Sequence, residues 1–180
     1  SSDSNYCVVS LYKLVEATTP TQTPTEEPTQ TPTQTPTQAS TQAPTMAAGE
    51  TYTKVTDVSE ITAGGEFVLV AVNGNTKVAL AAPNSGKITP VDITAQISGT
   101  TLIVTADTPV YIIASTTGGI SLKMGSDYLG YGSSGTNFTK PDSAYAWAVS
   151  EKDTTDTFQF TSAAKTDRAV AYQSSGDCFG

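Results

Sequence analysis

The sequence predicts an all-β protein. We expect a single small barrel or β-trefoil-like domain with pseudo-repeats, completed by an N-terminal strand that precedes a Thr/Pro-rich linker. Short β-branched and aromatic segments recur about every 8–12 residues. A Tyr-x-Ser-Ser-Gly-x-x-Phe pattern occurs twice, and a strand-like segment at the N-terminus is set apart from the rest by a tract that cannot form a core. We therefore expect three parts: a donor or permuted strand (1–16), an extended Thr/Pro/Gln-rich linker (17–48) and a β domain (49–180).

The opening segment, residues 6–15, reads YCVVSLYKLV and is typical of a strand. Its aromatic and apolar side chains are the candidates for insertion into a sheet: Tyr6, Val8, Val9, Leu11, Tyr12 and Leu14.

The tract that follows carries proline at every fourth position from Pro20 to Pro36. Each proline favours extended geometry in the residue before it and removes a backbone donor. The sequence thus predicts a semi-rigid spacer, about 28 residues of which could reach roughly 85 Å. An inert linker and an O-glycosylated stalk both fit this composition.

The β domain begins with a predicted strand at 52–56. A single helical turn is expected at 57–62, because Asp57 followed by Glu60 forms a capping-box pattern. The Asn73-Gly74 pair predicts a hairpin. Further strands are predicted at 66–72, 77–82, 87–93, 100–104, 110–114, 120–124, 128–131, 144–149, 157–160 and 168–172.

Repeats organise this domain. Residues 131–138 (YGSSGTNF) match residues 172–179 (YQSSGDCF) at an offset of 41, and LAAPNSGK (80–87) is a weaker third copy. Three such units predict pseudo-threefold symmetry. Aromatic residues at equivalent repeat positions predict equivalent core layers: Tyr131, Phe138, Tyr145, Tyr172 and Phe179.

The last repeat stops at Gly180, and its second half is found at the N-terminus. When Ser1 is written after Gly180, eight of the fifteen positions from Tyr131 to Tyr145 agree without a gap. The opening strand is therefore predicted to take the place of the strand that would follow Gly180. It could come from the same chain, as in a permuted monomer, or from a neighbouring chain. The long spacer favours the neighbour, and self-insertion is blocked if Glu50 lies far from the pocket for residues 6–15.

The two cysteines fall on either side of this join. Cys7 and Cys178 are nine positions apart in the joined order and flank a turn of hairpin length, so we expect a disulfide between them. Two free thiols are the alternative. A disulfide in a Thr/Ser/Pro-rich acidic chain fits an extracellular or cell-surface location.

Composition excludes several function classes. The net charge is −8, so no basic surface is expected for nucleic acid, and no apolar run is long enough for membrane insertion. There is no histidine, and the acidic residues follow no catalytic or metal-binding pattern. We expect no enzyme activity, no cofactor and no metal.

Two segments resemble a little-characterised β-module of secreted gut-bacterial proteins. These are YTKVTDVSEITAGGEFVLVAV (52–72), which opens that module, and YCVVSLYKL (6–14), which closes it. The resemblance implies an exported accessory module without catalytic residues. This chain differs from the module by carrying the closing strand at the N-terminus.

Together these features predict a structural subunit of an extracellular, pilus-like fibre. Subunits would polymerise head to tail by strand exchange, so the expected partner is another copy. The alternative is a secreted carbohydrate-binding or adhesion module, monomeric or in a tandem array. In that case Tyr6, Tyr131, Tyr145, Tyr172 and Trp147 would stack on glycans.

Overall fold

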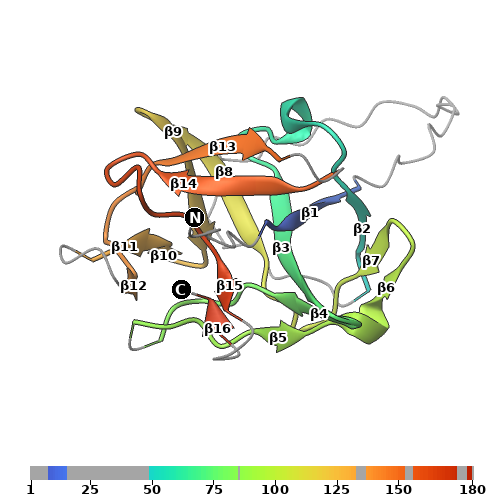
Figure 1. The fold of residues 1–180 in the computed structure, drawn as a ribbon. Coiled ribbons are helices and arrows are strands. Elements are labelled where there is room, and N and C mark those ends of the chain that lie inside the picture. The colour runs from blue at the N-terminus through green and yellow to red at the C-terminus, as the bar shows by residue number, and fades with distance from the viewer. Residues whose placement is uncertain are drawn as a thin grey trace, which may run out of the picture.

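The computed structural model describes residues 8–15, 49–84, 86–132, 137–152, 156–173 and 178–179. The protein is all-β, as predicted, and its pairs of strands are antiparallel (Figure 1). The first half of the described chain contains β1 (Ser10–Leu14), β2 (Thr51–Lys54), the 3-10 turn η1 (Val58–Glu60), β3 (Glu66–Asn73), β4 (Thr76–Ala79), β5 (Val91–Asp92), the 3-10 turn η2 (Thr94–Gln96), β6 (Ile97–Ser98) and β7 (Thr101–Ile103). The second half contains β8 (Tyr111–Thr116), β9 (Gly119–Met124), β10 (Asp127–Tyr128), β11 (Gly130–Tyr131), β12 (Phe138–Thr139), β13 (Trp147–Glu151), β14 (Phe158–Ser162), β15 (Tyr172–Gln173) and β16 (Cys178–Phe179).

Local sequence signals are confirmed at two places. Asp57 caps η1, and Glu60 completes the capping box by accepting hydrogen bonds from the backbone at the N-cap. The β3–β4 hairpin turns at Gly74, whose φ of 60° lies in the left-handed region that glycine adopts readily.

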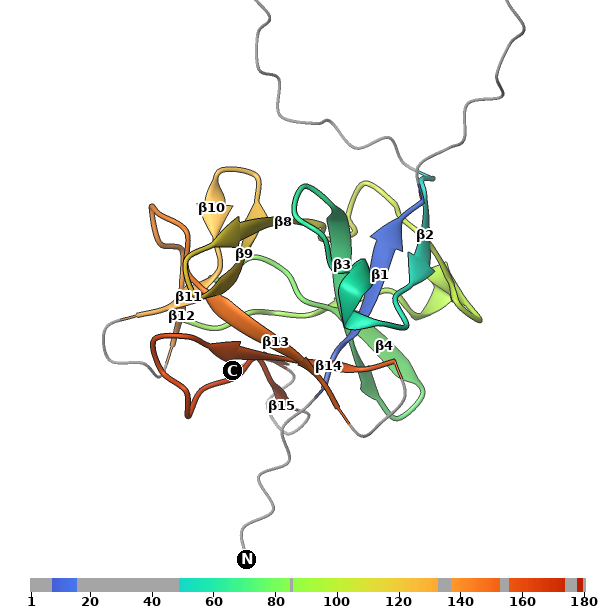
Figure 2. The same cartoon turned by 90° about the horizontal axis from the view of Figure 1, so that it is seen from above.

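The large sheet has the order β14-β13-β9-β8-β3-β1-β2-β7-β6. Strand β1 therefore lies inside the sheet, between β3 and β2 (Figure 2). The predicted barrel is not found as a closed sheet. Between β1 and β14 the described residues contain only an isolated bridge, Val9 with Phe158, so the ladder does not run continuously around.

A threefold pattern is nevertheless present in the pairing. The three units begin with β3, β9 and β14. Strand β8 lies between β3 and β9, and β13 lies between β9 and β14. Strand β1 lies between β14 and β3, where the Val9–Phe158 bridge links it to β14. Each unit also contains a short hairpin or bridge. Tyr131 pairs with Phe138 in one unit and Tyr172 with Phe179 in the next, in the register that the sequence repeat predicts. In the third unit Asn84 forms a bridge with Lys87.

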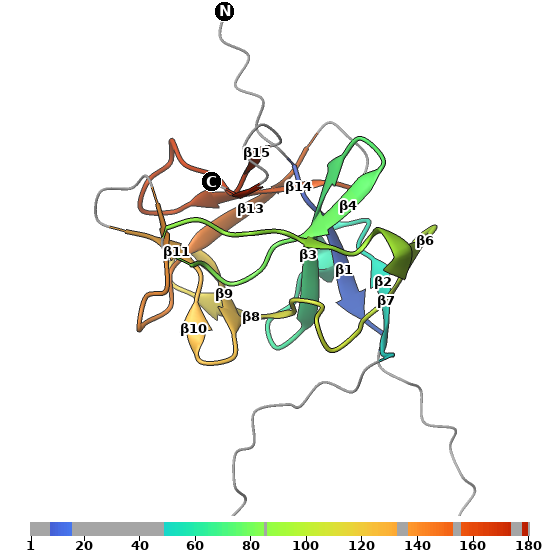
Figure 3. The same ribbon diagram turned by 90° about the horizontal axis from the view of Figure 1, so that it is seen from below.

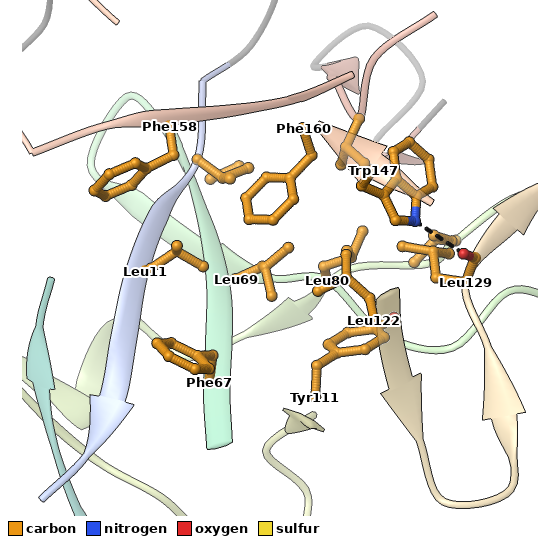
Figure 4. Packing of buried hydrophobic residues seen from close by; sticks show 14 of the residues in the cluster. Leu11, Phe67, Leu69, Leu80, Tyr111, Leu122, Leu129, Trp147, Phe158 and Phe160 are labelled. Atoms are coloured by element: carbon orange, nitrogen blue, oxygen red, sulfur yellow. Dashed lines mark hydrogen bonds between the residues drawn. The ribbon is translucent and has the colours of Figure 1, made fainter. Parts of the chain in front are cut away.

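Two apolar cores lie on opposite faces of β1 and β3. The larger contains Leu11, Leu69, Leu80, Phe158 and Trp147, and Figure 4 shows these side chains converging from separate strands. The smaller is built mainly on β2, β3 and β7, and includes Tyr52, Val68 and Leu102. Strands β2, β6 and β7 form an extension at the opposite end of the molecule from β10 and β11 (Figure 3).

Candidate functional site: the strand socket

The place that receives the N-terminal strand is the candidate functional site. We call the facing edges of β2 and β3, between which β1 lies, the strand socket. Leu11 pairs with Leu69 and Tyr12 with Val68 on the β3 side, and Leu14 pairs with Tyr52 on the β2 side. Both edges of β1 are thus satisfied by backbone hydrogen bonds, so the sheet is interrupted if this strand is removed.

Both faces of β1 are covered as well. Val9 and Leu11 are buried in the larger core, and Leu11 is 0% exposed. Tyr12 is buried in the smaller core, where Leu14 packs against it. Val8 is half-buried. A strand with two buried faces is nearly continuously apolar, as this one is. Of the predicted strand-exchange residues, only Tyr6 lies outside the described residues.

Polar contacts hold the strand at both ends of the socket. Near its end, Lys13 Nζ donates to the carbonyl oxygen of Glu60 at 3.2 Å and to Thr62 Oγ1 at 3.4 Å. Near its beginning, Ser10 Oγ donates to the carbonyl oxygen of Asp156 at 3.5 Å. The Asp156 carboxylate accepts from Lys54 of β2 at 3.3 Å.

Sequence analysis did not identify the roles of Lys13 and Asp156 in these contacts. Lys13 reads as an ordinary polar residue within a mostly apolar strand, and Asp156 belongs to no motif. Its φ of 58° is the one positive value among the described non-glycine residues. Aspartate tolerates this left-handed conformation better than most residues do, and that tendency is the only signal the sequence offered.

A groove of about 620 Å³ opens beside the Lys13 end of the socket. Its lining comes from β1 and from the turn that leads into β3: Lys13, Leu14, Thr62, Ala63, Gly64, Gly65 and Glu66. Nearby, Tyr52 Oη donates to Glu66 Oε2 at 3.0 Å. Burial, followed by this bond to a carboxylate, raises the pKa of Tyr52 well above its ordinary value. The phenol therefore stays protonated and acts as a donor.

The residues that flank the linker, Val15 and Gly49, lie at the same edge of the socket. Val15 N donates to the carbonyl oxygen of Thr51 at 3.1 Å, and Gly49 N donates to that of Val104 at 2.6 Å. The chain thus leaves β1 and enters β2 at neighbouring points and in opposite directions. The sequence left open whether Glu50 would lie far from the pocket. It lies close, so this geometric obstacle to self-insertion is absent.

Of the predicted repeat-core residues whose side chains are described, Tyr131 and Phe138 are buried and Tyr145 is half-buried. Tyr131 is 7% exposed and stacks on Phe138 at 4.8 Å between ring centroids. Its hydroxyl donates to the carbonyl oxygen of Ala169 at 2.9 Å. Tyr145 is half-buried against Trp147, with its hydroxyl 2.6 Å from Ser162 Oγ. Tyr172 and Phe179 are described only as a backbone pair.

This burial bears on the glycan-stacking alternative. Trp147 is 0% exposed and donates through Nε1 to the carbonyl oxygen of Leu129 at 3.0 Å, as Figure 4 shows. Neither Trp147 nor Tyr131 offers a ring face to a sugar. The two residues act instead as core layers of their units.

The predicted disulfide stays a prediction. Cys178 lies in β16 opposite Gln173, but its side chain is not described, and Cys7 lies outside the described residues.

Within the described residues no group of three or more His, Cys, Asp or Glu could hold a metal ion. No helix in the same part of the chain is long and apolar enough to cross a membrane. Comparisons with protein-family models, curated proteins and solved structures gave no match. The resemblance to a secreted gut-bacterial module therefore stays a prediction.

Proposed function

We propose that this protein is a structural subunit of an extracellular filament, in which the N-terminal strand of one copy fills the strand socket of the next. One observation supports this most directly. Strand β1 is an interior strand with both faces buried, yet the sequence joins it to the β domain through a 32-residue Thr/Pro-rich tract, residues 17–48.

An empty strand socket would be energetically costly. Removing β1 would leave the edges of β2 and β3 unpaired and expose Leu69 and Val68, which are buried on opposite faces of β3. Open apolar edges of this kind promote aggregation. Every folded copy therefore needs a strand, either its own or that of a neighbour.

The direction of the chain at the linker ends bears on this choice. A self-inserted strand requires the linker to reverse direction and return to a neighbouring point, because β1 and β2 are antiparallel. The sequence of the linker predicts extended polyproline-like geometry, which resists such a reversal. An exchanged strand lets the linker run onward to the next copy. This contact is heterologous and does not close on itself, so it generates a filament.

The second candidate is a secreted monomeric or tandem adhesion module that fills its own socket. The hydrogen bond from Val15 to Thr51 favours it, because the end of β1 and the start of β2 are already adjacent for self-insertion. A tethered strand has an effective concentration on the order of millimolar, against which a neighbour must compete. Glycans belong to this candidate as ligands. Neither candidate assigns the chain a catalytic role or a cofactor.

Refolding at increasing protein concentration tests the choice. The full chain is compared with a hairpin-locked variant, in which residues 16–48 are replaced by a four-residue Asn/Gly turn. The two strand ends are adjacent, so this turn forces self-insertion. We expect the full chain to form oligomers that grow with concentration, and the locked variant to remain monomeric by light scattering.

A second measurement asks whether the socket accepts a strand in trans. Leu11→Asp places a charge in the larger core and should expel the chain's own strand. The variant should then be poorly soluble alone and recover when a synthetic peptide of residues 1–16 is added. The proposal is overturned if the full chain stays monomeric up to millimolar concentration and the Leu11→Asp variant ignores the peptide.

A further inference from the structure

We infer that Lys13 sets the register in which the N-terminal strand enters the strand socket. The socket would then admit a strand with a cation at this position and disfavour other apolar strands. This deepens the proposed function, because it identifies what the socket recognises. It relies on that function only in treating β1 as an exchangeable strand.

Besides Lys13, the strand has a polar side-chain contact at Ser10, whose hydrogen bond to Asp156 is long at 3.5 Å. Lys13 is the only charged residue among residues 8–15, and apolar side chains cover both faces of β1. In a strand with one buried face, a slip of one residue exposes the apolar side chains. Here a slipped strand would still present apolar residues to both cores, so the apolar pattern alone distinguishes only weakly between registers.

Lys13 lies where a cation is satisfied. Its backbone is paired with Phe67 on one side and Thr53 on the other. Its ammonium lies 6.0 Å from the centroid of the Phe67 ring, within reach of a cation–π interaction. It also reaches the carbonyl oxygen of Glu60 and the hydroxyl of Thr62, both in the segment that leads into β3.

The turn that carries the acceptor for Lys13 is held by its own hydrogen bonds. Asp57 Oδ1 accepts from Ser59 N at 2.7 Å, and Glu60 Oε1 accepts from Asp57 N at 3.0 Å and from Thr56 N at 2.9 Å. None of these bonds involves β1. They fix the η1 turn, and with it the direction of the Glu60 carbonyl group. The end of the socket is therefore preorganised to receive a donor.

Two neighbouring registers would bury the charge, whereas a two-residue slip the other way would move Lys13 to the exposed place of Val15. A slip of one residue turns Lys13 toward the smaller core. A slip of two residues that brings Val15 opposite Thr53 moves Lys13 into the place of Leu11, which is fully buried. An ammonium group without a partner is strongly disfavoured there. The observed register keeps the charge at the rim, where it has two acceptors.

This identifies the partner by its chemistry. The socket fits a strand with a small apolar residue, leucine, an aromatic residue and lysine in the order of Val9, Leu11, Tyr12 and Lys13. Another copy of this chain carries that strand. An apolar edge strand that lacks the lysine would bind in mixed registers.

Disulfide trapping in the full chain tests the inference. Cys7 and Cys178 are first replaced by serine. Val15→Cys with Thr51→Cys reports the observed register, because their backbones are hydrogen-bonded and both side chains are exposed. Val15→Cys with Thr53→Cys reports the two-residue slip, since Thr53 is also exposed and faces Lys13 in the observed register.

With Lys13 present, the 15–51 product should exceed the 15–53 product by at least tenfold. Lys13→Met should reduce this ratio about tenfold, and Lys13→Arg should restore it. Thr62→Val removes one acceptor and should reduce the ratio severalfold even if the Met variant folds poorly. Unchanged ratios in both Lys13→Met and Thr62→Val would overturn the inference. The measurement is made on dilute monomer, so its outcome is independent of whether strands exchange between copies.

Discussion

Val9 and Phe158 exchange both of their backbone hydrogen bonds, at 3.0 and 2.8 Å. The pair joins the N-terminal segment to β14, and both side chains are buried in the larger core. It is an isolated bridge rather than part of a ladder. Among the described residues this is the one backbone bridge between β1 and the unit that begins with β14, so we expect that unit to depend strongly on the presence of the N-terminal strand.

Leu11→Ala should lower the free energy of unfolding by about 2–5 kcal/mol, because it leaves a cavity in a fully packed position. Urea denaturation measures this loss. The matched control is Val15→Ala, whose parent side chain is 48% exposed and should contribute no more than about 0.5 kcal/mol. Equal effects in the two variants would mean that the strand is not packed as described.

A circular permutant that begins at Gly49, joins Gly180 to Ser1 and ends at Glu16 should fold as a monomer. The repeat predicts this join, since β1 takes the place in its unit that β13 takes in the preceding one. We expect a stability no lower than that of the dilute full chain, and no change in mass with concentration. A permutant that fails to fold would contradict the joined repeat.

Tyr131→Ala should cost roughly 3–5 kcal/mol, because it removes a buried aromatic ring that stacks on Phe138. Tyr131→Phe keeps the ring and loses only the hydrogen bond to Ala169, so about 1 kcal/mol is expected. Thermal unfolding distinguishes the two variants. Full stability of the alanine variant together with loss of glycan binding would support the lectin-like alternative.

The η1 turn should loosen in acid. The backbone hydrogen bond from Thr56 is the main cause that lowers the pKa of Glu60, and the hydrogen bonds from Ser59 lower that of Asp57. A carboxyl pKa that is lower in the folded state stabilises the fold above the unfolded value, about 4.3 for glutamate and 3.9 for aspartate. That contribution is lost as the pH falls through the lower folded values.

Amide hydrogen exchange at Thr56, Asp57 and Ser59, followed between pH 6 and pH 2, measures this loosening. Glu60→Gln retains an acceptor oxygen but does not titrate. The Thr56 and Asp57 amides, which bond to residue 60, should then lose most of their pH dependence beyond the intrinsic exchange rate. If the parent chain and the Glu60→Gln variant show the same acid dependence, protonation of Glu60 is not the cause of the loosening.

Cys7 and Cys178 should be bonded to each other, and under the proposed function the bond links neighbouring copies. Isotopically light and heavy chains are mixed, refolded together and digested without reduction. Mass spectrometry should find mixed light–heavy peptides alongside the uniform ones. If only uniform peptides are found, the bond is internal and covalent joints between copies must be abandoned.

Much of the fold could be predicted from local signals. Alternation, the Asn73-Gly74 turn and the Asp57–Glu60 capping box depend on neighbouring residues, and all three are found in the structure. The repeat also predicted the equivalent pairing of Tyr131 with Phe138 and Tyr172 with Phe179. The repeat predicts this pairing because segments with the same sequence pattern pack in the same way.

The extension and the ends of the socket could not be predicted in the same way. Strands β2, β6 and β7 interrupt the threefold pattern, and the smaller core that they form with β3 depends on contacts distant in sequence. Lys13 and Asp156 gain their roles only from the segments that tertiary folding brings beside β1. No spacing rule within 8–15 or 152–157 encodes those neighbours.

The adjacency of Val15 and Thr51 has a mechanical consequence. In an exchanged filament, tension enters a domain along the donated strand at Val15 and leaves along its own β2 at the same edge. Such a load opens the β1–β2 pairs one at a time, starting at Leu14 and Tyr52, instead of shearing them together. Each joint would therefore unzip at low force, and a Cys7–Cys178 bond beyond the far end of β1 would bear the load once the strand has opened.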